Sequence, residues 1–288
     1  MRSLRLTKAA FNQPVVTITM TALVMSVLLL LIIPSHSTSS ASTASKPAQQ
    51  QAQAALFTYW SVDDGLSSSV FLNNASGIEL TVRPTLYNLS GKQLVINPIT
   101  LGARRQITAN IADWLNQNNA DDSFKQGNLI LNYEAENATL LGSQVVITKA
   151  ASSLSFDVPV AMPTSFESSR LEGIWWRPNE ASRYDLVLSN MQGSSVEVKV
   201  AVSGSHGLKD ADFDITLAPH QTEVVNLEDN QGGFAAELGK MGTVSITHTG
   251  VPGAVVASGM LSEDKKGFSS RFVFEDPDAS RSQTLAAA

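Results

Sequence analysis

The chain has 288 residues, 43% of them hydrophobic, which is enough to bury one or two packed cores. Its formal net charge is −6, but residues 1–55 carry four basic side chains and no acid, so the remainder (16 basic against 26 acidic) has a net charge of −10. An acidic body without a basic patch argues against binding to nucleic acid or to anionic lipid. The absence of cysteine excludes disulfides, thiol catalysis, cysteine-bound metals and iron–sulfur clusters.

The N-terminal segment has the pattern of a membrane-targeting helix. Three basic residues within the first eight positions precede an uncharged apolar run over residues 15–33, which is long enough to span a bilayer. We therefore predict that residues 1–33 form a signal anchor, with the C-terminal body outside the cytoplasm. A cleaved signal peptide is the alternative, which would make the protein secreted or periplasmic. Residues 34–55 are rich in Ser, Thr, Ala and Gln and predict a disordered linker.

Short segments of alternating hydrophobicity follow the linker. Period two is clearest over residues 80–86, and Pro84 within that segment predicts an edge or bulged strand because proline cannot donate to a ladder. Asn110 is expected to cap a short helix that presents Trp114 and Leu115 on one side. Strands are expected over residues 67–74, 80–86, 94–101, 106–111, 128–133, 139–148 and 154–159.

The same order of segments occurs a second time, 116 residues further on. Tyr59-Trp60 aligns with Trp175-Trp176, and Asn74 aligns with Asn190. The alternating valines of residues 196–202 match the alternating segment of the first copy. The sequence therefore predicts an all-β protein made of two tandem β-sandwiches that arose by internal duplication, preceded by the N-terminal helix.

The predicted boundaries follow from this repeat. The first sandwich is expected over residues 56–163, the second over residues 164–276, and a disordered tail over residues 277–288. The junction between the copies is short, so the two sandwiches are expected to contact each other. One larger sandwich or barrel containing both copies is the competing architecture.

One part of each copy resembles a known class of domain. In the second copy, an Asn-bearing turn at Asn190 is followed by the valine strand and then by a Leu217-Ala218-Pro219-His220 turn. This order is similar to that of the immunoglobulin-like domains of bacterial envelope and surface proteins, including the cell-adhesion-related type. The resemblance covers about 40 residues of each copy. It implies an immunoglobulin-like sandwich, and such sandwiches have many functions.

The sequence offers little for catalysis or for metal binding. It contains no nucleophile-elbow motif and no phosphate-binding glycine loop, so we predict that the protein is not an enzyme and has no catalytic residue, no cofactor and no metal. The acidic run at residues 210–214 and the Asp63-Asp64-Gly65 turn are the nearest approaches to a cation site, but neither completes a calcium motif. The histidines are expected to be exposed turn or strand residues: His36, His206, His220 and His248.

The aromatic residues at the start of each copy are the remaining candidates for a binding site. Exposed tryptophans can act as flat platforms for sugars, and this makes a carbohydrate-binding module the alternative function. Repetition in both copies favours a packing role, with one ring of each pair buried. The residues singled out for a binding role are Trp60, Trp175, Trp176 and Arg177.

Together these patterns predict a non-catalytic envelope protein that serves in adhesion, scaffolding or protein binding. The expected partner is a protein or a polysaccharide of the envelope, and the expected contact with the membrane is through the N-terminal helix.

Overall fold

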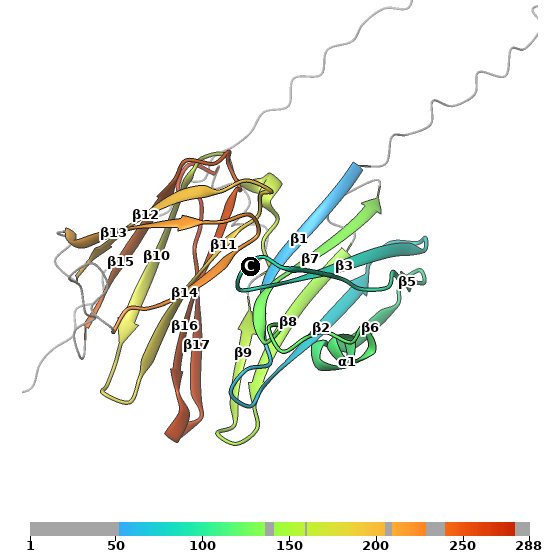
Figure 1. Ribbon diagram of the computed structural model, residues 1–288, viewed down its shortest axis with the longest axis horizontal. Coiled ribbons are helices and arrows are strands. Elements are labelled where there is room, and N and C mark those ends of the chain that lie inside the picture. The colour runs from blue at the N-terminus through green and yellow to red at the C-terminus, as the bar shows by residue number, and fades with distance from the viewer. Residues whose placement is uncertain (1–51, 136–140, 159, 205–208, 229–239, 280–288) are drawn as a thin grey trace, which may run out of the picture. The chain divides into compact units, whose positions relative to one another are not determined.

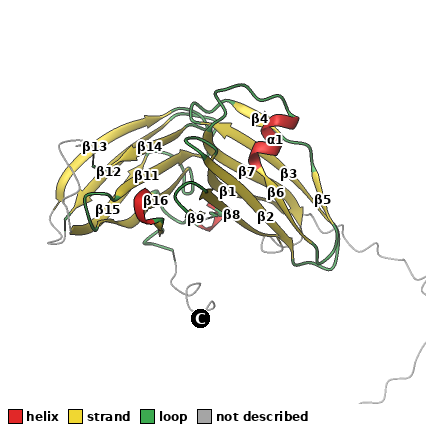
Figure 2. Ribbon diagram, turned by 90° about the horizontal axis from the view of Figure 1, so that it is seen from below, coloured by secondary structure: helices red, strands yellow, loops and turns green. Residues whose placement is uncertain are grey.

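The computed structural model describes residues 52–135, 141–158, 160–204, 209–228 and 240–279, which belong to one compact unit. This part of the chain is all-β: it contains four antiparallel sheets and a single short α-helix (Figures 1 and 2). Within these ranges no helix is long and apolar enough to cross a membrane. The predicted targeting helix at residues 15–33 lies outside the described residues.

Two of the sheets are built from residues 52–158, which we call the first half. Sheet A has the strand order β1-β7-β3-β4, with β5 also paired to β3, and sheet B has the order β6-β2-β8-β9. Strand β1 begins at Ala52, three residues before the predicted end of the linker at residue 55. The strands are β1 (Ala52–Ser61), β2 (Leu66–Asn74), β3 (Leu80–Asn88), β4 (Gln93–Val95), β5 (Ile99–Leu101), β6 (Gln106–Asn110), β7 (Gln126–Ala135), β8 (Leu141–Lys149) and β9 (Leu154–Val158).

The other two sheets are built from residues 170–273, which we call the second half. Sheet C has the order β10-β15-β12-β13 and sheet D the order β14-β11-β16-β17. Each position in sheet C or D thus has a counterpart in sheet A or B, with β13 in the place shared by β4 and β5. The strands are β10 (Arg170–Arg177), β11 (Arg183–Asn190), β12 (Val196–Ser203), β13 (Lys209–Leu217), β14 (Thr222–Asn226), β15 (Lys240–His248), β16 (Val255–Glu263) and β17 (Phe268–Val273).

The strand registers change one part of the sequence alignment. Trp60 pairs with Gly127 on β7, and Trp175 pairs with Gly242 on β15. Trp60 therefore corresponds to Trp175, 115 residues away, and not to Trp176 as the sequence alignment has it. The shift arises in the connection to the next strand, which has one residue more in the second half (178–182) than in the first (62–65). Insertions of this kind are tolerated in loops because few contacts depend on their length.

The two corresponding tryptophans anchor the two cores in the same way. Both rings are fully buried, and each indole Nε1 donates to a backbone carbonyl at 3.0 Å, from Trp60 to Asn128 and from Trp175 to Ser203. The paired glycine permits a close approach of the neighbouring strand. A Cβ on Gly127 would lie 2.0 Å from the Tyr87 carbonyl oxygen, and a Cβ on Gly242 would lie 1.8 Å from that of Ser203.

A buried asparagine closes the same corner of each half. The side-chain amide of Asn74 donates to three backbone carbonyls, and its Oδ1 accepts from the Ser76 N–H. Asn190 makes the corresponding set, donating to Ser194, Leu217 and Ala218 and accepting from Gln192. A buried amide is costly unless it is hydrogen-bonded. Each asparagine therefore holds the turn that follows its own strand against the end of a second strand, β5 in the first half and β13 in the second.

The predicted helix cap is confirmed. Helix α1 (Ile111–Gln117) is the short helix of Figure 1. It begins after Asn110, whose Oδ1 accepts from the Ala112 N–H at 2.8 Å. The helix buries the predicted side, with Ile111, Trp114 and Leu115 in the core of the first half. In the second half Asn226 accepts from the Glu228 N–H at the corresponding place.

The prediction that the strand containing Pro84 lies at an edge is wrong. Strand β3 is internal and pairs with β7 on one side and with β4 and β5 on the other. The carbonyl of Pro84 accepts from Ile96, so the missing N–H points to the gap between the two short strands, where the ladder needs no donor.

The two halves pack sheet against sheet. Val187, on the face of sheet D that points away from its own core, belongs to the same buried cluster as Tyr59 of sheet A. The Tyr87 and His220 rings are stacked with 4.4 Å between their centroids. The Thr222 N–H donates to the Leu89 carbonyl at 3.0 Å. The halves are thus joined by an apolar and hydrogen-bonded interface in addition to their short covalent connection.

Candidate functional site

Two of the four predicted binding residues do not reach the surface. Trp60 and Trp175 lie in the cores of the first and second half, with their indole N–H groups bonded to backbone. In this arrangement neither ring can present a face to a ligand. Adjacent residues of a strand point to opposite faces, so the ring after Trp175 must point outward.

Trp176 and Arg177 are half-buried and lie at the end of β10. The Trp176 ring meets the Phe268 ring edge-on, with 6.4 Å between the centroids. The Arg177 Nη2 lies 3.7 Å from the Glu228 Oε2. Burial raises the pKa of the Glu228 carboxyl, and the positive charge of Arg177 opposes that rise. Arg177 is therefore held by a carboxylate of its own half.

Trp176 is surrounded by exposed apolar side chains. Ile174 is 45% exposed and lies on the same face of β10, and Met241, the register partner of Trp176 on β15, is 51% exposed. Phe268 is 39% exposed. We call Ile174, Trp176, Met241 and Phe268 the Trp176 patch. Apolar side chains that gather in this way on a soluble surface are typical of interaction sites, whereas single exposed ones are common.

The sequence did not single out three members of this patch. Ile174 and Trp176 are two residues apart in a strand, so they share a face, and this spacing was the available signal. Met241 and Phe268 come from distant strands, and their proximity depends on the pairing of β10 with β15 and on the position of β17.

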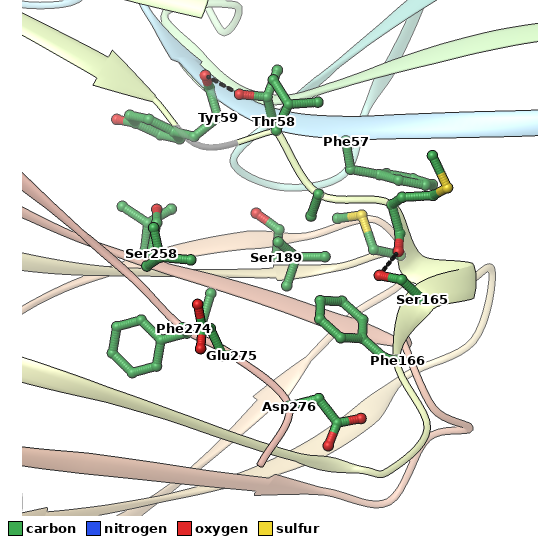
Figure 3. A pocket seen from close by; sticks show the side chains of 18 of the residues that line it. Phe57, Thr58, Tyr59, Ser165, Phe166, Ser189, Ser258, Phe274, Glu275 and Asp276 are labelled. Atoms are coloured by element: carbon green, nitrogen blue, oxygen red, sulfur yellow. Dashed lines mark hydrogen bonds between the residues drawn. The ribbon is translucent and has the colours of Figure 1, made fainter. Parts of the chain in front are cut away.

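A pocket of about 660 Å³ lies where the halves meet, and Figure 3 shows it. Phe57, Thr58 and Tyr59 of β1 line one side, and Ser189 and Ser258 lie opposite. Mixed apolar and hydroxyl lining of this kind is compatible with small-molecule binding. The charged residues of the lining are Glu172, Glu275 and Asp276, all of them acidic.

The carboxylates at the end of this pocket have a structural role. Asp276 accepts hydrogen bonds from the backbone N–H groups of Glu167 and Ser168 and from the Ser168 hydroxyl. Burial alone would raise the pKa of Asp276, but these bonds and one from the Asp278 N–H lower it to about 2. The charged carboxylate thus fastens the segment after β17 to the segment before β10.

A second pocket of about 780 Å³ between the halves contains the Asp63-Asp64 turn. Lys149 Nζ lies 2.8 Å from Asp64 and 3.0 Å from Asp264, so the lysine bridges the two halves. The hydrogen bond from Lys149 lowers the pKa of Asp64. The ammonium group of Lys149 therefore neutralises part of the turn that, in the sequence, came nearest to a cation site.

The other polar candidates are also accounted for or lie outside the described ranges. Asp212, in the acidic run, is 3.0 Å from Lys199. No group of three or more His, Asp or Glu residues that could hold a metal ion exists among the residues that the structure describes. His36 and His206 fall outside those residues.

The prediction that the histidines are exposed is wrong for His248. This residue is buried on β15 opposite Val198, at the position that Tyr133 takes opposite Val82 in the first half. The position is a core position in both halves. His220 is half-buried in the stacked contact with Tyr87. Burial lowers the pKa of both imidazoles.

Comparisons with known proteins identify no family. No protein-family model matches the sequence, and no curated protein matches it. Among solved structures, similarity is found to a Bacteroides uniformis beta-glucuronidase 2 covalently bound to cyclophellitol-6-carboxylate aziridine, with 10% identity, a TM-score of 0.19, and coverage of 77% of this chain and 26% of that one. A Bacteroides uniformis beta-glucuronidase gives 11% identity, a TM-score of 0.19, and coverage of 77% and 26%. This chain spans about a quarter of their length, and a likeness at this TM-score carries no argument.

Proposed function

We propose that the protein is a non-catalytic binding protein of the bacterial envelope, serving in adhesion, scaffolding or protein binding. Its body would consist of two immunoglobulin-like sandwiches that arose by duplication. The matched strand orders, the Trp–Gly pairs and the two asparagine corners support the duplication. The observation that carries the binding role is the Trp176 patch, an exposed apolar surface on a body whose other large aromatic rings are mostly buried.

The physical reason is the energy of apolar burial. Each Å² of apolar surface removed from water contributes about 25 cal/mol, so a partner that covers this patch gains from it without needing a charged site. Aromatic residues and methionine are also enriched at the centres of protein interfaces. Protein binding therefore fits the composition of the patch better than metal, nucleotide or nucleic-acid binding does.

Carbohydrate binding is the alternative function. It would depend on Trp176 alone, because Trp60 and Trp175 are buried. The Phe268 ring already meets the Trp176 ring edge-on, which leaves a single, partly covered platform. A glycan array probed with the full chain tests this alternative, and glycan binding lost in Trp176→Ala would favour it over protein binding.

The proposed location is membrane-anchored through residues 15–33, with the body outside the cytoplasm. A secreted or periplasmic form after cleavage is the alternative. N-terminal sequencing of the mature protein separates them. An intact N-terminus supports the anchor, and a start between residues 35 and 44 contradicts it.

The binding role is tested by retention of envelope proteins on the immobilised full chain. Ile174→Glu places a charge in the patch and is expected to release components that the wild type retains. Val95→Glu is the matched control, because Val95 is 63% exposed but lies on β4, outside the patch. Identical retention by wild type, Ile174→Glu and Val95→Glu would contradict the proposed role of the patch.

A further inference from the structure

Each half has one outward sheet face that packs on the other half and one that does not. Within the chain, the outward face of sheet A packs on the outward face of sheet D, where outward means away from the core of the same half. By strand order sheet C corresponds to sheet A, and sheet B corresponds to sheet D. The outward faces of sheets B and C therefore hold the same places as the two faces that are already joined.

The correspondence reaches individual residues. Tyr59 pairs with Asn128 in sheet A, and Ile174 pairs with Thr243 at the same place in sheet C. Tyr59 is buried in the interface, whereas Ile174 is 45% exposed. The second half thus has an apolar side chain at the position by which the first half contacts its neighbour.

The opposing face shows the same relation. Val187 lies at the centre of the outward face of sheet D and is buried with Tyr59. Its counterpart in sheet B is Phe71, which pairs with β6 and β8 as Val187 pairs with β14 and β16. The neighbouring Met260 of sheet D corresponds to Val146 of sheet B. Phe71 and Val146 are both half-exposed.

We propose that the protein associates head-to-tail with further copies of itself, the outward face of sheet C in one copy packing on the outward face of sheet B in the next. Ile174 would contact Phe71 and Val146, as Tyr59 contacts the Val187 region within the chain. This inference rests on the proposed binding role of the Trp176 patch and names its partner. Because the two faces differ, the contact is heterologous and repeats along a chain of copies instead of closing on itself as a symmetric dimer does.

The contact between copies should be weaker than the contact within the chain, because sheet C lacks part of the apolar surface of sheet A. Within the chain, the apolar cluster of Phe57, Tyr87 and Ile130 adds to the interface. The corresponding positions in sheet C carry Glu172, Ser203 and Ser245. The contact between copies is therefore smaller and more polar, and it has no covalent connection to raise the local concentration. Association should be weak and dependent on concentration.

Complementation of two blocked variants tests the proposal. Ile174→Glu blocks the sheet C face and leaves the sheet B face intact, and Phe71→Glu does the reverse. Sedimentation of the full chain in mild detergent, between about 1 and 100 μM, covers the range expected for a small transient interface. The wild type and the control Val95→Glu should form oligomers that grow with concentration. Each blocked variant should remain monomeric, and their equimolar mixture should form dimers but nothing larger.

A cysteine experiment identifies the contact directly, because the chain has no cysteine of its own. Mixing Ile174→Cys with Phe71→Cys under mild oxidation should give a disulfide-linked dimer of the two variants, since a disulfide requires Cβ atoms about 4 Å apart. Mixing Val95→Cys with Phe71→Cys should give none. This arm does not depend on the behaviour of the charged variants.

The outcomes separate this proposal from the proposed function. A wild type that stays monomeric, or blocked variants that do not complement each other, overturns head-to-tail association. If Ile174→Glu then still loses envelope proteins that the wild type retains, the binding role stands and its partner is a different protein. If Ile174→Glu neither dissociates oligomers nor loses any component, both proposals are wrong.

Discussion

The outward faces of sheets A and C hold the same place in the two halves, yet one is covered and the other is open. Sheet A presents Phe57, Tyr59 and Tyr87 to the neighbouring half, and all three are buried. Sheet C presents Ile174 and Met241 to solvent. The strand order, the buried tryptophan and the corner asparagine are common to both halves. The halves differ in the side chains of this one face. The same core can therefore carry a face that is buried against a neighbour or a face that is exposed to solvent.

Among the tests of this comparison, removal of the buried indoles should have the largest effect on stability. Trp60→Ala and Trp175→Ala should each lower the free energy of unfolding by about 3–5 kcal/mol, because each removes a fully buried indole from its core. Trp176→Ala should cost about 1 kcal/mol or less, since its ring is half-buried. Urea unfolding followed by circular dichroism measures all three. A loss in Trp60→Ala that matches Trp176→Ala instead of Trp175→Ala would restore the sequence alignment.

The two corner asparagines give the next largest effect. Asn74→Ala and Asn190→Ala each remove an amide that serves three carbonyls, and each should cost about 1–3 kcal/mol for the groups left unpaired. Asn73→Ala, at an exposed position beside Asn74, is the control. Thermal unfolding of the full chain is the measurement. A large loss in only one of the two variants would show that the corners are not equivalent.

Much of the fold was predictable because local signals agreed with the tertiary structure. The alternation over residues 80–86, the turn at Asn74 and the cap at Asn110 each reflect a short-range pattern, and the structure has a strand, a corner and a helix start there. The position of Pro84 was misjudged because its ladder is broken by a split in the neighbouring strand, which the residues around Pro84 do not reveal.

The candidate site was predictable only in part. Neighbouring tryptophans in a strand imply one buried and one outward ring, and the structure has Trp175 and Trp176 in those roles. The inserted residue in the second connection shifted the alignment by one, so Trp60 was matched to the wrong ring. Met241 and Phe268 are more than 60 residues from Trp176. The pairing of β10 with β15 brings Met241 beside Trp176, and the position of β17 brings the Phe268 ring there.

The smallest expected effect concerns His248, which holds the position in the second half that Tyr133 holds in the first. It should make the stability of the protein depend on pH. Burial keeps the pKa of His248 below its ordinary value of 6.5, so the unfolded chain binds a proton that the folded chain does not. The stability contributed by neutral His248 is present above pH 6.5 and is lost as the pH falls through the lowered pKa. His220 acts with the same sign.

The expected result is a melting temperature that falls between pH 7.5 and pH 5.5, a range above the ordinary pKa values of Asp and Glu. His248→Gln should reduce this dependence and leave the part that comes from His220. Scanning calorimetry across this range is the measurement. An unchanged slope in His248→Gln would mean that the imidazole is solvated in the folded protein.

The central claim is that the second half leaves open a face whose counterpart the first half covers. Hydroxyl-radical footprinting of the full chain, read residue by residue by mass spectrometry, measures both faces in one experiment. We expect rapid oxidation of Trp176 and Met241 and slow oxidation of Phe57, Tyr59 and Tyr87 in dilute protein. Equal protection of the two sets in the monomer, or faster oxidation of Tyr59 than of Trp176, would contradict the account.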